Sequence, residues 1–280
     1  MPDPTTQLRR LTGRTLLADA GPPPRLVVVS GGKLGLGSTT LAVNLAVALA
    51  SHGSRTVLID ADQARADAAA HCGVSGPIGI ADVLLGRRNI HEVLQRGPGG
   101  MQVVVGACTA EARTACTDRA LARVLRQIHS LGRHADLVLL DSGSAPGDAM
   151  LRFWQAADDV LLVTTPDAAH VMDTYATIKT LLSRATIGGR LRLVVNRATS
   201  AVVAEDVHHR IDRSCQRFLG LAIPLAGWLP HDPAARAAAA RGQPAILDQP
   251  SAPLAAAVDR LAELVLSAPE RPHRQAAEAA

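Results

Sequence analysis

The hydrophobic positions of this chain follow two alternating patterns. Short runs rich in Val, Leu and Ile, with few polar residues between them, are typical of strands buried on both faces. The runs are Leu26–Ser30, Thr56–Asp62, Met101–Ala107, Asp136–Asp141, Asp159–Thr165 and Leu191–Asn196. Between them lie segments of helical period, so the pattern predicts an α/β fold, a doubly wound and mostly parallel sheet with helices on both faces, in three layers.

The segments between these runs repeat their apolar residues every three or four positions, as amphipathic helices do. Three such stripes are Leu121, Val124, Leu125, Ile128 and Leu131; Val203, Val207, Ile211 and Phe218; and Leu254, Ala257, Val258, Leu261, Leu264 and Val265. In an open parallel sheet the ligand lies at the carboxyl ends of the strands. The residues that follow each strand are therefore the first candidates for a functional site.

The two ends of the chain depart from this pattern. Residues 1–24 are polar and basic and finish in Gly21-Pro22-Pro23-Pro24, which predicts an arm and a stiff spacer outside the fold. Residues 267–280 offer little to bury, so we expect a disordered tail. One domain over residues 25–266 is then predicted, which suits the length of the chain.

Composition excludes some classes of protein. There are 29 Lys and Arg residues against 25 Asp and Glu, and a net charge of +4 is too small to indicate DNA binding. Aromatic residues make up 2% of the chain, which leaves few platforms for stacking single-stranded bases. The chain shows neither a signal peptide nor an apolar run long enough for a membrane span, so we expect a cytoplasmic protein.

A glycine-rich turn follows the first predicted strand. Gly32-Lys33-Leu34-Gly35-Leu36-Gly37-Ser38-Thr39-Thr40 leads into a helix, a context in which backbone N–H groups hold phosphate. The P-loop pattern G-x-x-x-x-G-K-[ST] fits from Gly32 to Thr39, except that Ser38 stands in place of the lysine. A turn that merely connects strand to helix is the alternative.

Two other strands end in aspartates. The second predicted strand finishes with Asp60-Ala61-Asp62, and the fourth finishes with Asp141. A carboxylate left unpaired at the end of a buried strand costs free energy. A Mg²⁺ ion beside Thr39 explains both positions at once, whereas a salt bridge to an arginine remains the alternative for either aspartate alone.

Together these segments resemble the MinD/ParA family of P-loop ATPases, whose deviant Walker A loop reads K-G-G-x-G-K-[ST]-T. The resemblance implies that Lys33 is the signature lysine and Asp62 positions the attacking water, as the two catalytic residues. It implies that Thr39, Asp62 and Asp141 hold Mg²⁺ and that Asn196 reads adenine. The residues implied around ATP or ADP are Gly32, Lys33, Gly35, Gly37, Ser38, Thr39, Thr40, Asn196, Arg197, Pro230 and Asp232.

The chain departs from the family at two positions of the loop. Ser38 replaces the P-loop lysine, and Leu34 stands where the pattern has glycine. Lys33 and Lys179 are the two lysines of the whole chain, so no neighbouring lysine repairs the loss. Because the family clamps phosphates electrostatically, we expect nucleotide binding to be weakened and ATP hydrolysis to be slow or absent.

Within the family, the resemblance points to the FlhG/FleN regulators of flagellar number. It is carried by Ala81–Gly86, Thr164–Pro166, Asp173–Lys179 and Gly227–Pro233, and it spans about residues 25 to 266. It implies an ATP-dependent homodimer in which Lys33 reaches the partner's phosphates. Flagellar basal-body or transcription-regulator proteins are further implied partners, and recruitment to a cell pole is an implied location.

The N-terminal arm resembles the D-Q-A-x-x-L-R motif with which these regulators stimulate FlhF, a GTPase related to those of the signal recognition particle. Asp3, Leu8 and Arg9 keep the spacing of that motif, while Pro4 and Thr5 replace its Gln and Ala. The resemblance therefore implies binding of an FlhF-like GTPase through Asp3, Leu8 and Arg9. A disordered leader is the alternative.

Two other functions stay open at this point. One is a pseudo-ATPase scaffold that binds partners in a single state without hydrolysis. The other is a ParA-type ATPase that partitions DNA or other cargo, although DNA binding is not expected from the charge. The amphipathic membrane-anchoring helix usual in the family is not expected, because the sequence after Leu266 lacks an apolar face.

Overall fold

The computed structural model describes residues 21–62, 64–107 and 109–269. Its strands form one eight-stranded sheet in the order β3-β4-β2-β5-β1-β6-β7-β8, parallel except for β3 against β4. In chain order the strands are β1 (Arg25–Gly31), β2 (Thr56–Asp60), β3 (Leu94–Arg96), β4 (Gln102–Val104), β5 (Leu137–Asp141), β6 (Asp159–Thr164), β7 (Arg190–Ala198) and β8 (Leu225–Pro230). The predicted doubly wound α/β fold is confirmed.

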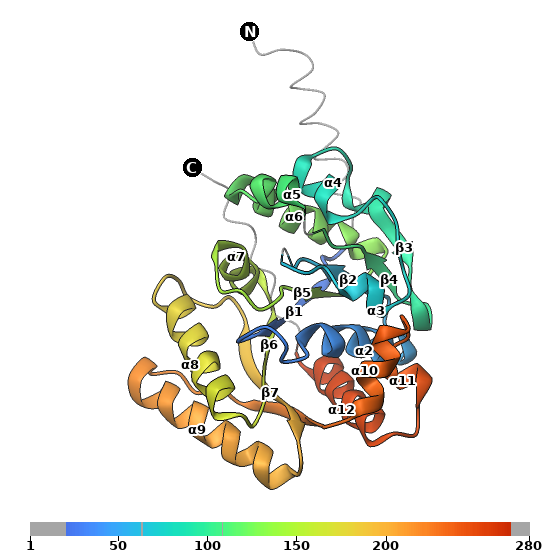
Figure 1. The fold of residues 1–280 in the computed structure, drawn as a ribbon. Helices are drawn as coiled ribbons and strands as arrows, with labels where there is room; N and C mark the ends of the chain where they lie inside the picture. Colours follow the sequence, from blue (N-terminus) through green and yellow to red (C-terminus); the bar gives the residue numbers. More distant parts are fainter. Residues whose placement is uncertain (1–20, 63, 108, 270–280) are drawn as a thin grey trace.

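Helices cover both faces of the sheet and make the three layers (Figure 1). One face carries α4 (Ile80–Leu85), α6 (Asp118–His129), α7 (Asp148–Ala156), α8 (Ala168–Leu182) and α9 (Ala201–Leu219). The other carries α2 (Ser38–Ser51), α3 (Ala68–His71), α10 (Pro233–Ala240), α11 (Ala245–Asp248) and α12 (Pro253–Ser267). A short helix α5 (Ala110–Ala115) precedes α6. The sheet thus separates two hydrophobic cores.

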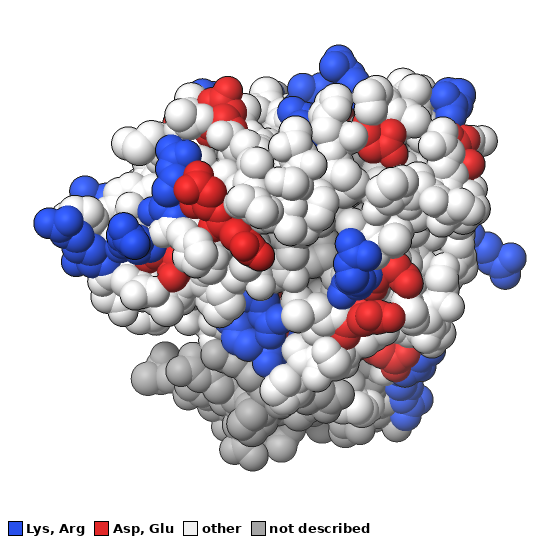
Figure 2. Space-filling view, turned by 90° about the horizontal axis from the view of Figure 1, so that it is seen from below, with Lys and Arg blue, Asp and Glu red and all other residues white. Residues whose placement is uncertain are grey.

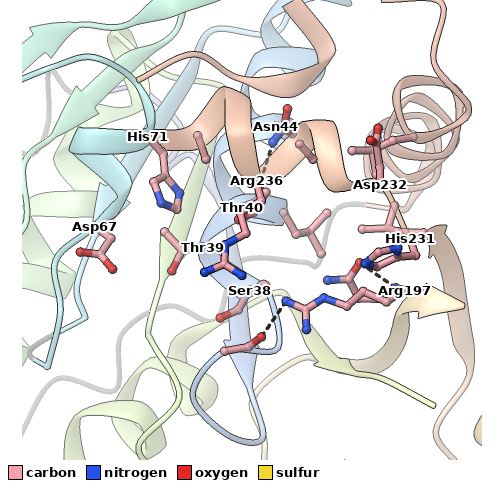
Figure 3. A pocket seen from close by; sticks show the side chains of 18 of the residues that line it. Ser38, Thr39, Thr40, Asn44, Asp67, His71, Arg197, His231, Asp232 and Arg236 are labelled. Carbon is pink, nitrogen blue, oxygen red and sulfur yellow. Dashed lines mark hydrogen bonds between the residues drawn. The ribbon is translucent and has the colours of Figure 1, made fainter. Parts of the chain in front are cut away.

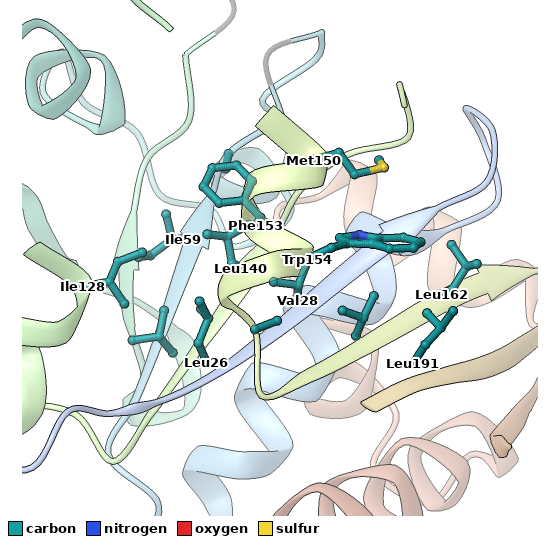
Figure 4. Packing of buried hydrophobic residues seen from close by; sticks show 14 of the residues in the cluster. Leu26, Val28, Ile59, Ile128, Leu140, Met150, Phe153, Trp154, Leu162 and Leu191 are labelled. Atoms are coloured by element: carbon teal, nitrogen blue, oxygen red, sulfur yellow. The ribbon is translucent and has the colours of Figure 1, made fainter. Parts of the chain in front are cut away.

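A buried tryptophan holds together the strands that lead to the glycine turn. Trp154 of α7 lies against the sheet among Val28, Leu162 and Leu191 (Figure 4). Its indole Nε1 donates a hydrogen bond of 2.8 Å to the hydroxyl of Ser30 on β1. That hydroxyl lies 2.5 Å from the hydroxyl of Ser142, just after β5. The ends of β1 and β5 are therefore fixed to each other below the glycine turn.

The sequence missed two strands and misplaced one side chain. β3 has only three residues, and β8 is a half-buried edge strand, so neither shows a continuous apolar run. On α9, Cys215 continues the buried stripe four residues after Ile211, whereas Phe218 is 64% exposed. The expectation that Phe218 is buried is therefore wrong.

The ends of the chain fall largely outside the described residues. Asp3, Leu8 and Arg9 of the predicted arm lie there, as does the predicted tail from residue 270 onward. Within the described part of the chain, no helix combines the length and apolar character needed to cross a membrane.

Candidate nucleotide-binding site

The glycine turn joins β1 to α2 at the carboxyl edge of the sheet, as predicted. The backbone N–H of Gly31 donates to the carbonyl of Gly143 at 2.9 Å, and buried Leu36 anchors the middle of the turn. Gly35 and Gly37 have φ angles of +87° and +89°, which side-chain-bearing residues rarely adopt. No side chain caps the first turn of α2, so its N–H groups are free to bind an anion.

Three aspartates gather beside this turn. Asp60 and Asp141 are paired in the parallel register of β2 and β5, and Asp62 follows two residues after Asp60. All three are buried, with exposed fractions of 0%, 0% and 7%. Burial, together with the neighbouring Asp141, raises the pKa of Asp60 to about 8, while burial raises the pKa of Asp141 to about 6. Ionising these carboxyl groups together is therefore costly, and a cation bound beside them would stabilise their charged forms.

The hydrogen bonds of Asp60 and Asp141 indicate different roles for these two carboxylates. Asp60 is fully engaged by the backbone N–H groups of Asp62 and Ala68, at 3.1 and 3.0 Å. Asp141 accepts from the N–H of Gly143 at 3.2 Å, and the nearby Thr39 hydroxyl acts to lower the Asp141 pKa, but Oδ2 of Asp141 is buried without a hydrogen-bond partner. An orphaned carboxylate oxygen beside a threonine hydroxyl fits a magnesium site.

The same surroundings limit what kind of metal site this is. Among the described residues, no group of three or more His, Cys, Asp or Glu side chains is arranged to hold a metal ion. Mg²⁺ commonly takes one or two carboxylates and completes its shell with water and phosphate oxygens. The arrangement of Thr39, Asp62 and Asp141 therefore fits Mg²⁺ that arrives with a nucleotide.

A pocket of about 750 Å³ opens over the turn. Figure 3 shows Ser38, Thr39 and Thr40 on its floor, with Asp67 and His71 on one side and Arg197 and His231 on the other. Of the predicted nucleotide-binding residues, the structure brings nine into its lining: Gly35, Gly37, Ser38, Thr39, Thr40, Asn196, Arg197, Pro230 and Asp232. Asp62 also lines it, whereas Asp141, which interacts with Thr39, does not.

Two of the predicted nucleotide-binding residues, Gly32 and Lys33, stay outside this lining. The backbone of Gly32 packs against α8, where an added Cβ would meet Thr174 at 2.7 Å, and its carbonyl accepts from the Thr177 hydroxyl at 3.1 Å. The ammonium of Lys33 lies 3.0 Å from the carboxylate of Asp173 on α8, with more than half of its side chain exposed. Lys33 therefore does not take the place of the missing P-loop lysine in this conformation.

The end of β7 holds the glycine turn from the opposite side. Asn196 donates from Nδ2 to the carbonyl of Leu36 at 2.7 Å, and Arg197 donates to the carbonyl of Gly35 at 2.9 Å. Arg197 has a φ of +58°, which is strained for a residue with a side chain. Leu34, where the family has glycine, is 54% exposed and leaves the pocket open.

Sequence reasoning missed several polar residues of the lining, including one on each of three helices. Asn44 lies on α2, His71 on α3, and Arg236 on α10. Asn44 joins α2 to α11, because its Nδ2 donates to the Thr40 carbonyl at 2.7 Å and its Oδ1 accepts from the Ile246 N–H at 3.0 Å. In the sequence, Arg236 is distinguished only as the single long side chain within the alanine-rich run Ala234–Ala240, and it belongs to no motif.

Comparison with known proteins places this geometry in a family. A ParA family model, described as NUBPL iron-transfer P-loop NTPase, matches residues 24–266. The antiactivator FleN of Pseudomonas aeruginosa is 32% identical over 216 residues, 77% of each chain. The flagellum site-determining protein YlxH of Helicobacter pylori is 26% identical over 155 residues, 55% of this chain and 53% of that one.

A solved structure shows the same fold. The septum site-determining protein MinD of Pyrococcus horikoshii, complexed with Mg-ADP, is 25% identical and superposes with a TM-score of 0.72. The match covers 86% of this chain and 96% of that one. The chain belongs to the ParA/MinD family of P-loop NTPases.

Proposed function

We propose that this protein is a nucleotide-binding switch of the FleN/FlhG kind, which binds ATP or ADP with Mg²⁺ and hydrolyses ATP slowly or not at all. The observation that carries the proposal is the open pocket itself. It retains the anion-binding start of α2 and the Thr39–Asp141 contact, while Ser38 occupies the position of the P-loop lysine. The similarity to MinD complexed with Mg-ADP supports the same ligand.

The residues divide the work of binding between them. The N–H groups that begin α2 hold phosphate, and Asn196 and Pro230 line the part of the pocket proposed for adenine. Thr39 and Asp141, with Asp62, would hold Mg²⁺, which neutralises phosphate charge when it is bound. Asp62 is also proposed to position water. Without the lysine, the transition state loses one charge from its electrostatic clamp.

Calorimetry and turnover measurements test this proposal together. Titration with ATP and with ADP, each with Mg²⁺, is expected to give binding weaker than that of a lysine-bearing relative. Steady-state ATP turnover is expected to be near background and to rise in Ser38→Lys. Absence of heat at millimolar nucleotide would leave only the scaffold function. Turnover that matches a lysine-bearing relative and is abolished by Asp62→Ala would contradict the loss of hydrolysis.

Dimerisation is the second part of the proposal. Lys33 would leave Asp173 and reach the partner's phosphates when two ATP-bound copies meet. The exposed position of the Lys33–Asp173 pair supports this, because an exposed ion pair contributes little stability and exchanges readily. Size-exclusion chromatography is expected to show a larger species with ATP than with ADP, and Lys33→Ala is expected to abolish it. A monomer under every nucleotide condition would contradict this part.

The biological role proposed is regulation of flagellar number, supported by the similarity to FleN and to the flagellum site-determining protein YlxH. An FlhF-like GTPase is the proposed partner of the arm, through Asp3, Leu8 and Arg9. A pulldown should recover such a GTPase and should lose it when Leu8 and Arg9 are changed to Ala. A fluorescent fusion would report whether the protein gathers at a cell pole.

DNA partitioning is the competing function in this family. Figure 2 shows one face of the molecule, on which Lys and Arg are interspersed with Asp and Glu instead of forming a continuous basic surface. Such a face offers little net attraction to a phosphate backbone. A salt-sensitive DNA mobility shift that requires nucleotide would favour the partitioning function instead.

A further inference from the structure

The pocket contains a cation that lies outside every motif of the sequence. Arg236 belongs to α10, which starts after Asp232, whose carboxylate accepts from the N–H of Ala234 at 2.9 Å. Arg236, Ala239 and Ala240 lie on one side of this helix and line the pocket. Figure 3 shows the Arg236 side chain extending into the pocket toward the start of α2. The other α10 residues in the lining are Pro233 and three alanines, all with short side chains, so no long side chain of this helix competes with the guanidinium for the pocket.

The other long cations at the site are already engaged. Lys33 pairs with Asp173 on α8 and does not line the pocket. Arg197 donates to the carbonyl of Gly35, and Arg65 donates from Nε to Asp67 at 2.7 Å. Each of these contacts must be given up, or shared, before the cation can serve a ligand.

Arg236 differs from them, because it has no hydrogen-bond or ion-pair partner among the residues that the structure describes. His71 lines the pocket from α3, which packs beside α10, but it cannot supply a dependable charge. Burial lowers the pKa of His71 below its ordinary value, so its ring is neutral at neutral pH. The remaining unengaged guanidinium of the lining is that of Arg236.

We propose that Arg236 contacts the phosphates of the bound nucleotide and supplies from α10 the positive charge that Ser38 does not supply from the loop. The proposal rests on nucleotide binding at this pocket. An arginine cannot replace lysine inside a tight glycine turn, because its planar guanidinium needs more room. It can serve from the facing wall, where a long side chain reaches phosphate oxygens and forms paired hydrogen bonds with them.

The first test compares variants by calorimetry, with ATP, ADP and adenosine as separate probes. Arg236→Gln keeps the length of the side chain and removes its charge. It is expected to weaken ATP and ADP binding about tenfold, the loss of one charge-assisted hydrogen bond, while adenosine binding stays unchanged. Arg236→Lys is expected to retain most of the affinity. Equal loss for adenosine would show that Arg236 stacks on the base, and this would overturn the proposal.

Arg260→Gln is the matched control. Arg260 lies on the exposed side of α12 outside the pocket lining, so its change removes the same charge from the molecule without touching the site. The affinity of the Arg260→Gln protein for ATP is expected to equal that of the unmodified protein. If Arg260→Gln weakens binding as much as Arg236→Gln, the effect is one of net charge and the specific contact is excluded. Circular dichroism melts exclude unfolding as the cause.

A double-mutant cycle with Ser38→Lys tests replacement directly. If Arg236 stands in for the loop lysine, its removal is expected to cost much less in the Ser38→Lys protein than in the unmodified protein. Equal costs in the two backgrounds would overturn the proposed replacement. Should the unmodified protein bind no nucleotide at all, the proposed function fails first. Should it bind and Arg236→Gln bind equally well, only the role of Arg236 fails.

Discussion

At the scale of single residues, the site depends on places where a side chain must be absent. Gly143, directly after the segment Asp141-Ser142, has a φ of +73°, and a Cβ added to it would lie 2.5 Å from the carboxyl carbon of Asp62. The Asp62 carboxylate is thus packed against a bare backbone. Its Oδ1 accepts from the N–H of Ala64 at 2.7 Å, which fixes its direction. Gly143 therefore helps to set the position of the Asp62 carboxylate, which is proposed to orient water.

Gly143→Ala should therefore damage the site more than the fold. We expect a loss of about 1–2 kcal/mol in the free energy of unfolding from backbone strain, and a clear weakening of Mg²⁺-dependent nucleotide binding as Asp62 is displaced. Gly220→Ala is the matched control, since Gly220 has a φ of +65° with nothing within 4 Å of an added Cβ. Urea unfolding and calorimetry measure the two effects. Unchanged Mg²⁺ dependence in Gly143→Ala would contradict the role given to the glycine.

At the scale of elements, α10 is the least self-sufficient part of the pocket wall. It has eight residues, six of them alanines, and a helix of this length is marginal on its own. Its stability comes from the Asp232 cap, from Pro233 at the first turn, and from Ala235 and Ala238 packed against the core. The position of Arg236 follows from that of the helix.

Changing the cap separates two roles for Asp232. Asp232→Ala is expected to lower the free energy of unfolding by about 1 kcal/mol and to weaken nucleotide binding, because the first turn of α10 frays. Asp232→Ser is expected to restore both, since a hydroxyl can accept from the N–H of Ala234. If Asp232→Ser restores the unfolding free energy but leaves binding weak, the carboxylate contacts the nucleotide itself. Urea unfolding paired with calorimetry distinguishes the outcomes.

At the scale of the whole molecule, one buried carboxylate ties the amino edge of the sheet together. Asp159 on β6 is 2% exposed and contacts Arg25 of β1, Arg190 of β7 at 2.8 Å, and Arg192 at 3.5 Å. Arg25 also donates to the carbonyls of Val265 and Ala268 at the end of α12. The network joins three strands to the last described helix, on the edge opposite the nucleotide pocket.

Asp159→Asn should destabilise the fold and leave the distant pocket unaffected. We expect the free energy of unfolding to fall by about 2–4 kcal/mol at pH 7, because three guanidinium groups lose their shared partner. Asp136→Asn, at an exposed pair with Arg55, is the control and should cost less than about 1 kcal/mol. Urea unfolding measures both. A loss at Asp159 no larger than that at Asp136 would contradict the structural role of the network.

The pH dependence of the same variant has a defined sign. Burial alone would raise the pKa of Asp159, but hydrogen bonds from Arg190 and Arg25 outweigh it and hold that pKa below its ordinary value. A carboxylate with a lowered pKa in the fold stabilises it above an unfolded-state pKa of about 4 and loses that contribution as the pH falls through the folded value. The difference in free energy of unfolding between the unmodified protein and Asp159→Asn should therefore become smaller below about pH 4. A difference that becomes larger below that pH would contradict the stabilising role of the ionised Asp159.

Most of the candidate site at the carboxyl edge of the sheet was predictable, because its signals are local or follow from the order of strands and turns. The glycine turn, Thr39 and the aspartates Asp62 and Asp141 all stand directly after apolar runs, and parallel strands bring their carboxyl ends to one edge. The edge strands β3 and β8 were not predictable in the same way, since a half-buried strand lacks a continuous apolar run. Phe218 was misplaced because periodicity does not reveal where a helix ceases to be covered.

The sequence by itself determined the α/β fold, the glycine turn and the serine that replaces its P-loop lysine, because apolar period and motif spacing are properties of the chain. Only the tertiary structure decided where the cations near the pocket lie. It directs Lys33 to Asp173 on α8 and brings Arg236 from α10 to face the turn. The contacts that a side chain makes with another helix or strand depend on how the two elements pack in three dimensions. The spacing of residues along the chain does not reveal that packing.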